Sequence, residues 1–453
     1  MSGATQTVAP MPARPTRMAT VLRVWQEQRG MATVAGWSFL AAVVARGSNL
    51  AALAICARVL GQVEFGQVAA IQSTVGMFAP LASLGLALTT TKFVAEYRDR
   101  APERAGRIIA LSLCAGTLAG ALMTAALIAL APVLAAKGFA NPELKKQLIE
   151  SSGLLLLGVI EAVQSGALTG LEAFSRIAKL SAWGGLLSIP VTAMLAAQYG
   201  TSGAIAGLTI SLFISCVLNG FMLNAECRRR NIRTTLAGCA SEKGVLFSFS
   251  LPAYVSGIVV APVSWLSTIL LVQQANGFAE MALFSAADRF RYILIFIPMA
   301  VSRIAMPALS RFRAESNQKA YRSAFHWNLG FSLLATVPAA GLCTIFAPRL
   351  LELFGHSFAS GWPVLSVLAI SAVPTVLNMQ LGAALLSNDR AWARTGIDLL
   401  LAVAFLGASL IAVPRWNALG LAGAFLFAYT VASLALWLCL REDRATAVAG
   451  VAE

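Results

Sequence analysis

The chain has 453 residues, of which 58% are hydrophobic and only 12% are charged; its mean hydropathy is +0.74 and its formal net charge is +14. Water-soluble folds carry about twice that share of charged residues, so the composition excludes a soluble enzyme and a disordered scaffold. At ~20 apolar residues per bilayer crossing, the length accommodates about a dozen membrane helices and leaves no room for a separate folded domain of ~100 residues.

Twelve apolar segments, bounded by charged residues or by clusters of Gly and Pro, follow one another along the chain. They cover residues 33–58, 65–91, 108–136, 150–173, 178–198, 202–224, 244–273, 279–307, 321–347, 360–387, 392–413 and 418–440. We therefore predict an all-α, polytopic membrane protein with twelve transmembrane helices. The first segment follows four Arg residues and is too long for a signal-peptide core, so we expect the N-terminus to stay uncleaved.

The distribution of Lys and Arg predicts the orientation. When the connections are assigned alternately to the two sides of the membrane, one side holds 24 of the 34 basic residues, the other side holds six, and four lie within helices. Cytoplasmic connections are the basic ones, so we expect both termini in the cytoplasm. The charge also favours attraction to the anionic inner leaflet over nucleic-acid binding, because no basic segment is interleaved with aromatic residues.

A basic central connection divides the twelve predicted helices into two halves of six. We expect a cytoplasmic tail at 1–32, an N-lobe of six helices at 33–225, a cytoplasmic linker at 226–243, a C-lobe of six helices at 244–440 and a cytoplasmic tail at 441–453. A single offset of 216 residues relates Gly61 and Glu64 to Gly277 and Glu280, Gln164, Gly166 and Ala167 to Gln380, Gly382 and Ala383, and Ala206 and Gly207 to Ala422 and Gly423. Such parallel repeats favour a pseudo-two-fold axis along the membrane normal and rocking of one lobe against the other.

Catalytic and metal motifs are missing from the sequence. Most of the seven Cys residues lie in apolar segments, and Cys227 and Cys239 have no His or further Cys nearby to complete a metal site. No nucleotide-binding glycine loop and no nucleophile motif is present. We therefore expect no enzyme activity, no catalytic residues, no metal and no cofactor.

Four local sequences resemble the polysaccharide-transport branch of the multidrug/oligosaccharidyl-lipid/polysaccharide exporter superfamily, whose members include O-antigen and exopolysaccharide repeat-unit flippases. They are ARVLGQVEFG at 57–66, GLALTTTKFVAEY at 85–97, GALTGLEAF at 166–174 and NGFAEMALFSAADRFR at 276–291. The resemblance covers residues 33–440. It implies alternating-access transport of an undecaprenyl-diphosphate-linked oligosaccharide from the inner to the outer leaflet of a bacterial inner membrane, for O-antigen, capsule or exopolysaccharide synthesis. The chain lacks the extra helices of some lipid II flippases in the superfamily.

Ionisable residues inside the predicted helices are the candidate site, because each costs ~3 kcal/mol or more at the bilayer centre unless it faces protein or water. A diphosphate crossing the membrane needs fixed cations and hydrogen-bond donors, and the planar guanidinium of Arg matches phosphate oxygens. We predict diphosphate ligands at Arg46, Asn49, Arg289, Arg291 and Arg303.

Three acidic residues, Glu161, Asp288 and Asp398, are candidates for binding the H⁺ or Na⁺ that drives transport. The alternative is structural: Asp288 pairs with Arg291 at i,i+3, and Glu161 pairs with Arg46. Both readings stay open at this stage, because the sequence does not show which helices face each other.

The seventh helix contains Pro252 and Pro262, each of which removes a backbone hydrogen bond. The pair predicts a bent helix, which is either a static kink or a moving hinge.

Two rival functions are an ion-coupled multidrug antiporter of the same superfamily and a membrane-embedded polysaccharide polymerase or ligase. The antiporter calls for an acid-lined cavity, whereas the predicted helices hold four Arg and three acids. The enzyme calls for a sizeable outside loop, and the connection around residues 136–150 is too short to fold alone. The expected partners are the lipid-linked oligosaccharide and membrane lipids; a polymerase or ligase stays open as a protein partner, and nucleic acid is not expected.

Overall fold

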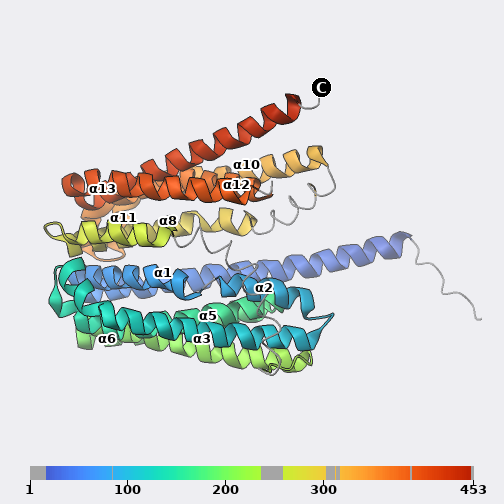
Figure 1. Ribbon diagram of the computed structural model, residues 1–453, viewed down its shortest axis with the longest axis horizontal. Helices are drawn as coiled ribbons and strands as arrows, with labels where there is room; N and C mark the ends of the chain where they lie inside the picture. Colours follow the sequence, from blue (N-terminus) through green and yellow to red (C-terminus); the bar gives the residue numbers. More distant parts are fainter. Residues whose placement is uncertain are drawn as a thin grey trace, which may run out of the picture.

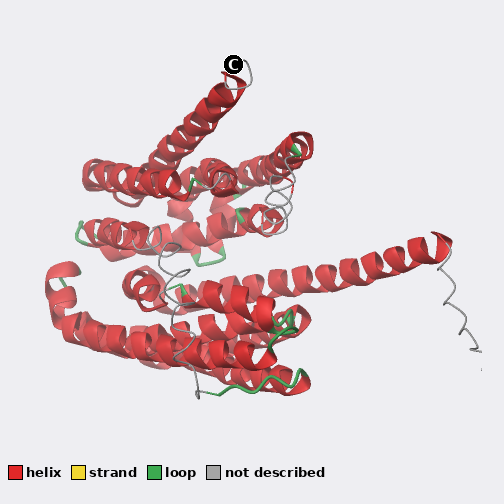
Figure 2. Cartoon of the chain, turned by 45° about the vertical axis from the view of Figure 1, so that its right-hand side comes forward, coloured by secondary structure: helices red, strands yellow, loops and turns green. Residues whose placement is uncertain are grey.

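The structure, a computed structural model, describes residues 17–83, 85–235, 259–302, 312, 317–387 and 390–449. These residues form helices joined by short loops and contain no strand (Figure 2). The helices are α1 (Arg17–Ser83), α2 (Leu86–Tyr97), α3 (Pro102–Val133), α4 (Lys145–Glu150), α5 (Ser152–Gly170), α6 (Phe174–Arg229), α8 (Gly277–Leu294), α10 (Gln318–Ile345), α11 (Ala347–Glu352), α12 (Trp362–Ser387) and α13 (Ala391–Ala449). A further apolar helix spans Val259–Val272, and short π or 3₁₀ turns span Leu134–Gly138, Pro142–Leu144 and His356–Gly361.

The three longest helices each contain a sharp turn and account for two membrane crossings. The turns lie at Gly61 (φ 75°) in α1, Gly200 (φ 58°) in α6 and Asn417 (φ 47°) in α13. Glycine reaches this left-handed region without a steric penalty, and Asn is the residue that tolerates it next best. With these helices divided at their turns, and with α2 continuing the second half of α1, the described residues contain twelve crossings, which confirms the predicted count.

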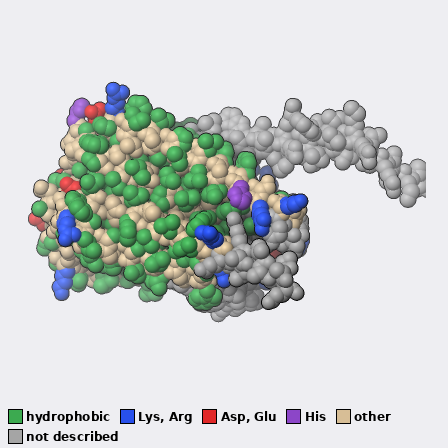
Figure 3. Space-filling model, turned by 90° about the horizontal axis from the view of Figure 1, so that it is seen from above, with side chains coloured by type: hydrophobic (Ala, Val, Ile, Leu, Met, Phe, Trp, Pro, Cys, Tyr) green, Lys and Arg blue, Asp and Glu red, His purple; other side chains and the backbone are tan. Residues whose placement is uncertain are grey.

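Two bundles of helices make up the molecule (Figure 1). The N-lobe consists of α1, α2, α3, α5 and α6, and the C-lobe consists of the helix at 259–272, α8, α10, α12 and α13. On the face seen from above, hydrophobic side chains cover much of the described surface, and most charged side chains in view lie towards its two ends (Figure 3). This distribution is that of a membrane-spanning protein.

The two ends of the molecule differ in how the lobes meet. We call the end that holds the turns at Gly61, Gly200 and Asn417 the sealed end, because one continuous core of buried side chains from both lobes includes Phe65 of α1 together with Phe354. We call the opposite end, where α2 and α6 finish, the basic end. Helix α1 begins at Arg17, well before the apolar segment predicted from residue 33, since a helix can continue beyond its membrane-buried part.

The 216-residue repeat has a structural basis. Glu280 Oε2 accepts a hydrogen bond of 3.1 Å from the backbone N–H of Ala418, at the start of the last helix of the C-lobe. Its counterpart Glu64 lies beside Gly200, where the last helix of the N-lobe starts, with Oε2 2.9 Å from the position that a Cβ would occupy. A carboxylate at a helix N-terminus stabilises the unpaired N–H groups and the helix dipole there. The repeated Glu therefore lies at the start of the final helix in each lobe, and in the C-lobe it caps that helix.

Candidate functional site

A cavity of about 440 Å³ lies between the two lobes. The second half of α1 and the helix at 259–272 supply two walls, and α8 and α13 supply the others. The polar and charged side chains that line it are Gln72, Ser73, Ser264, Trp265, Thr268, Ser285, Asp288, Arg289, Arg291 and Tyr292.

The cavity lies near the middle of the membrane-spanning region. Gln72 follows the turn at Gly61 by eleven residues and Arg289 follows Gly277 by twelve, so both lie about 17 Å from the sealed end at 1.5 Å per residue. The hydrocarbon core of a bilayer is about 30 Å thick. A polar cavity at mid-depth between two repeated lobes is the arrangement expected for a transport site.

Arg289 is the cation of the cavity that has no acidic partner within the described part of the chain. Its Nη2 donates a hydrogen bond of 3.0 Å to Oε1 of Gln72, in the opposite lobe, and the side chain is half-buried. The Gln72 amide is neutral, so this contact leaves the positive charge of Arg289 uncompensated.

Arg291, two residues further on, is held differently. Its Nε donates a hydrogen bond of 2.6 Å to Oδ1 of Asp288, and its guanidinium carbon lies 4.2 Å from the ring centroid of Phe425. Only 5% of its side chain is exposed. The i,i+3 pairing of Asp288 and Arg291, one of the two readings of the sequence, is thus present. It neutralises Arg291 and occupies the carboxylate that lies nearest to Arg289 in the sequence.

The other predicted phosphate ligands lie elsewhere. Arg46 and Asn49 are not among the residues that line the cavity. Arg46 precedes Gly61 by fifteen residues, or about 22 Å, which places it towards the basic end. Its guanidinium carbon lies 4.2 Å from the ring centroid of Phe296, in the opposite lobe. Arg303 lies outside the described residues.

Two of the acidic candidates have different surroundings. Glu161, on α5, accepts a hydrogen bond of 3.3 Å from Asn219 of α6, and no ion pair involves it among the described residues. The pairing of Glu161 with Arg46, the structural alternative left open by the sequence, is therefore not seen. Asp398 forms two contacts with Arg394, of 2.7 and 3.1 Å, and Arg394 also donates two bonds of 3.1 Å to Asn378.

The helix at 259–272 carries Pro262 and brings Ser264, Trp265 and Thr268 into the cavity. The other predicted hinge residue, Pro252, lies outside the described part of the chain. Ala261, the residue before Pro262, also lines the cavity.

The second half of α1 carries a polar run, which the prediction from charged residues does not include. Ser73 Oγ donates to Thr268 Oγ1 at 3.2 Å, and Trp265 Nε1 donates to Thr74 Oγ1 at 3.0 Å. Together with Gln72, three consecutive residues of the N-lobe bond to the C-lobe. The signal in the sequence was three adjacent polar residues, Gln72-Ser73-Thr74, inside an apolar helix.

Hydrogen bonds join the lobes at the sealed end. Arg58 donates to the backbone carbonyls of Leu353 (2.8 Å) and Glu352 (3.1 Å), and Gln62 donates to that of Ser357 (2.7 Å). In the reverse direction, Gln273 of the C-lobe donates to the carbonyls of Lys137 and Gly138 at 3.0 and 2.9 Å. These contacts close the sealed end next to the shared aromatic core.

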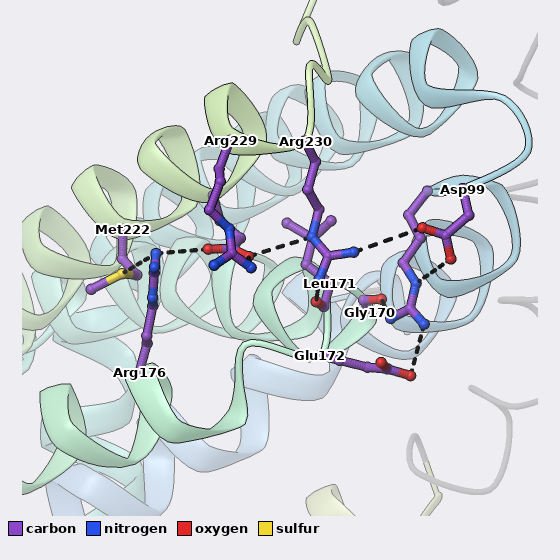
Figure 4. Close-up of polar contacts among 10 residues, drawn as sticks. Asp99, Gly170, Leu171, Glu172, Arg176, Met222, Arg229 and Arg230 are labelled. Atoms are coloured by element: carbon purple, nitrogen blue, oxygen red, sulfur yellow. Dashed lines mark hydrogen bonds and ion pairs between the residues drawn. The ribbon is translucent and has the colours of Figure 1, made fainter. Parts of the chain in front are cut away.

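At the basic end, an ionic network ties the N-lobe together (Figure 4). Glu226, whose side chain is only 2% exposed, accepts from Arg176, Arg229 and Arg230 at 2.7, 2.9 and 3.4 Å. Arg230 also donates to the carbonyl of Leu171 at 2.9 Å. The network therefore links the end of α6 to the start of the same helix and to the α5–α6 loop.

A fourth arginine, Arg98, extends this network to the α2–α3 turn, where Asp99 contacts both Arg98 and Arg230. Arg98 contacts Glu172 at 2.8 Å and Asp99 at 3.1 Å, and donates to the carbonyl of Gly170 at 3.0 Å. The hydrogen bond with Glu172 raises the pKa of Arg98 above the ordinary value for arginine, so the guanidinium stays charged. All of these contacts lie within one lobe, and they connect α2, the α5–α6 loop and both ends of α6 at its basic end.

Comparison with known proteins settles the family. The model of the family described as "Polysaccharide biosynthesis protein" matches residues 33–313. The chain belongs to this family. Among curated proteins, it is 24% identical over 272 residues to the EPS I polysaccharide export inner membrane protein EpsE of Ralstonia nicotianae, a match that spans 58% of this chain and 62% of that protein. It is also 25% identical over 346 residues to the succinoglycan biosynthesis transport protein ExoT of Rhizobium meliloti, which spans 74% of this chain and 65% of that protein.

Solved structures share the fold. An inward-facing multidrug resistance MATE family transporter of the MOP superfamily has a TM-score of 0.77 at 17% identity, with 90% of this chain and 98% of that chain covered. An outward-facing MATE family transporter has a TM-score of 0.66 at 17% identity, over 90% and 96% of the two chains. The lipid II flippase MurJ, in an inward closed conformation, has a TM-score of 0.69 at 14% identity, over 89% and 87%.

Proposed function

We propose that the protein is a flippase that moves undecaprenyl-diphosphate-linked oligosaccharide repeat units across the bacterial inner membrane by alternating access. The product would serve the synthesis of O-antigen, capsule or exopolysaccharide. The observation that carries this proposal is Arg289, a cation at mid-membrane in a cavity between the lobes, bonded to a neutral amide. The names of the relatives, which refer to polysaccharide export and transport, support a transporter and not an enzyme.

The charge balance of the cavity favours an anionic cargo. Its charged lining residues are Asp288, Arg289 and Arg291, and the first and last of these neutralise each other. One positive charge remains, and a charge at this depth costs ~3 kcal/mol or more unless a partner or water offsets it. A diphosphate head group supplies that partner, whereas a cationic drug would be repelled. This argues against the multidrug antiporter.

The polar surroundings suit the rest of the cargo. Ser285 and Tyr292 offer hydroxyl groups to phosphate or sugar oxygens, and Trp265 offers a flat face at the same level. Sugars pack against aromatic faces through their C–H groups while their hydroxyls bond to polar neighbours. The cavity therefore combines one phosphate-binding cation with a lining that suits a saccharide.

The proposed cycle starts from the conformation described here. Hydrogen bonds and buried aromatic side chains close the sealed end, and the arrangement of helices agrees better with the inward-facing MATE transporter than with the outward-facing one. We assign the basic end to the cytoplasm, following the asymmetry of Lys and Arg. In a background without native Cys, an impermeant thiol reagent should label Asn141→Cys and not Thr235→Cys in spheroplasts with intact inner membranes; the reverse pattern would invert the assignment.

For coupling to H⁺ or Na⁺, Glu161 is the better candidate of the two acids outside the cavity. Its carboxylate accepts one bond from a neutral amide, whereas Asp398 is matched by Arg394. A carboxylate without a cationic partner inside a membrane is stabilised by taking up a proton or a small cation. Pro262 is the proposed hinge, because its helix forms a cavity wall. Membrane lipids and a polysaccharide polymerase or ligase are the proposed further partners.

The decisive test replaces Arg289. A charge-assisted hydrogen bond contributes about 1.5–3 kcal/mol, so Arg289→Ala should weaken binding of undecaprenyl diphosphate by roughly ten- to a hundredfold and abolish lipid-linked oligosaccharide flipping in proteoliposomes. Arg289→Lys should restore only part of the activity, because an ammonium lacks the planar donor fork. Arg415→Ala, an exposed arginine near the turn at Asn417, is the matched control. Wild-type flipping by Arg289→Ala would refute the proposed site.

A further inference from the structure

Gln72 accepts a hydrogen bond from Arg289, the cation that the proposed cargo requires. Its Oε1 accepts the 3.0 Å bond from Arg289 across the lobe boundary, and both side chains line the cavity. A diphosphate that binds Arg289 through the same donor must therefore displace Gln72. Since Gln72 and Arg289 belong to different lobes, this exchange also removes a contact between the lobes.

Within the described residues, Gln72, and not a carboxylate, is the hydrogen-bond acceptor for Arg289. The nearest carboxylate in the sequence, Asp288, is bonded to Arg291 at 2.6 Å and is thus already occupied. If Arg289 paired with that carboxylate, its charge would be neutralised and would attract an anion far less. A neutral amide orients the guanidinium towards the opposite lobe and leaves its charge intact.

We propose that Gln72 is a positioning residue that holds Arg289 across the cavity until a diphosphate anion displaces it, so that cargo binding releases a tie between the lobes. This inference rests on the proposed function of the cavity. The bond from Arg289 to the Gln72 amide joins one ionised group to a neutral one, whereas a bond from Arg289 to phosphate joins two groups of opposite charge and can be bidentate, so phosphate oxygens outcompete the amide. A neutral lipid or sugar has no such advantage and leaves the tie in place.

Among the described residues, few polar contacts join the two lobes at the level of the cavity. Beside the Gln72–Arg289 bond, the described contacts at this level are the hydroxyl bond from Ser73 to Thr268 and the bond from Trp265 to Thr74. Both are bonds between neutral groups. Losing the one charged contact therefore removes the strongest polar tie of the cavity wall and favours movement of the lobes. In this way only an anionic cargo breaks the Gln72–Arg289 bond, and it does so before the lobes separate.

The test uses the full-length protein in nanodiscs, in a background without native Cys. Spin labels at Val63→Cys and Ser360→Cys, both exposed at the sealed end and in opposite lobes, report the opening of that end through the distance between them. The ligands are undecaprenyl diphosphate and, separately, inorganic pyrophosphate, whose binding is measured by calorimetry. Comparing them distinguishes a lipid head group from free pyrophosphate as the source of the anion.

Two substitutions of Gln72 make opposite predictions. Gln72→Leu removes the acceptor, so the ligand-free protein should already show the longer distances that the wild type shows only with ligand. Gln72→Glu gives Arg289 a charged partner, so binding should weaken by about tenfold and the distances should stay short in the presence of ligand. Gln67→Leu is the matched control, because Gln67 accepts its bond from Thr201 within the N-lobe and does not line the cavity.

The outcomes separate this inference from the proposed function. If the wild type binds neither diphosphate, the proposed cargo and the displacement are both wrong. If it binds undecaprenyl diphosphate but both Gln72 variants keep wild-type affinity and wild-type distances, only the role of Gln72 is refuted. Opening by pyrophosphate alone would identify the free anion, and not the lipid head group, as sufficient to release the tie.

Discussion

Replacing Glu226 by Gln removes one negative charge from the most buried carboxylate of the basic end and keeps its shape. Three arginines lie around it, Arg176, Arg229 and Arg230, at 2.7 to 3.4 Å. Only 2% of the Glu226 side chain is exposed, whereas the arginine side chains are 39%, 61% and 25% exposed. The substitution thus leaves three clustered cations, which water reaches only in part.

The magnitude follows from these exposures. Removing one partner of a fully buried ion pair costs about 3–5 kcal/mol, but water can solvate partly exposed arginines, which lowers the cost. Hydrogen bonds to charged groups are worth about 1.5–3 kcal/mol. Repulsion among the three arginines adds to the loss of these bonds. We therefore expect Glu226→Gln to destabilise the N-lobe by about 2 kcal/mol.

The assay is hydrogen exchange in detergent, read separately for the end of α6 and for α12 in the other lobe. Protection should fall at the end of α6 and around Leu171 and should stay unchanged in α12. Glu172→Gln is the control, because that carboxylate is 58% exposed and an exposed pair contributes about 0–1 kcal/mol. Equal loss of protection in the two variants, or none in Glu226→Gln, would refute the reasoning.

Three further predictions follow from single contacts. Arg394→Ala strands the buried Asp398 and should lower the amount of folded protein, measured by size-exclusion fluorescence, whereas the double substitution with Asp398→Ala should recover it. Gly166→Val should lower the melting temperature, because a Cβ there would lie 2.5 Å from a backbone oxygen of α2, while Gly341→Val, with open space around it, should not. Arg58→Ala removes two bonds between the lobes, so accessibility of a cysteine placed in the sealed end to an impermeant thiol reagent should rise; unchanged labelling would show that this end stays closed without the Arg58 bonds.

The fold was largely predictable, because a membrane limits the choices. Each crossing needs about 20 apolar residues, so length and hydropathy predict twelve helices, and glycine at Gly61 and Gly200 marks where two of the hairpins turn. What hydropathy does not predict is where helices end outside the membrane, as the start of α1 at Arg17 shows.

The site was predictable only in part. Arg289 and Arg291 were predicted because an ionised side chain inside a membrane must face protein or water, and both line the cavity. The sequence did not distinguish them, since their difference depends on Asp288 pairing with one arginine and not with the other. Gln72 was missed because neutral polar residues in a membrane helix are less costly than charges. Arg394 was missed because it was assigned to a connection, although its i,i+4 spacing from Asp398 was available in the sequence.

The hydrogen bonds described between the lobes at the sealed end all pair a side-chain donor with a backbone acceptor. Arg58 and Gln62 bond to the C-lobe backbone, and Gln273 bonds to the N-lobe backbone. Every residue type carries a carbonyl, so substitutions on the accepting segments leave these acceptors in place as long as the backbone keeps its path. Mutation can therefore adjust the polar part of this seal through three donor positions, while the side chains of the accepting segments are free to vary.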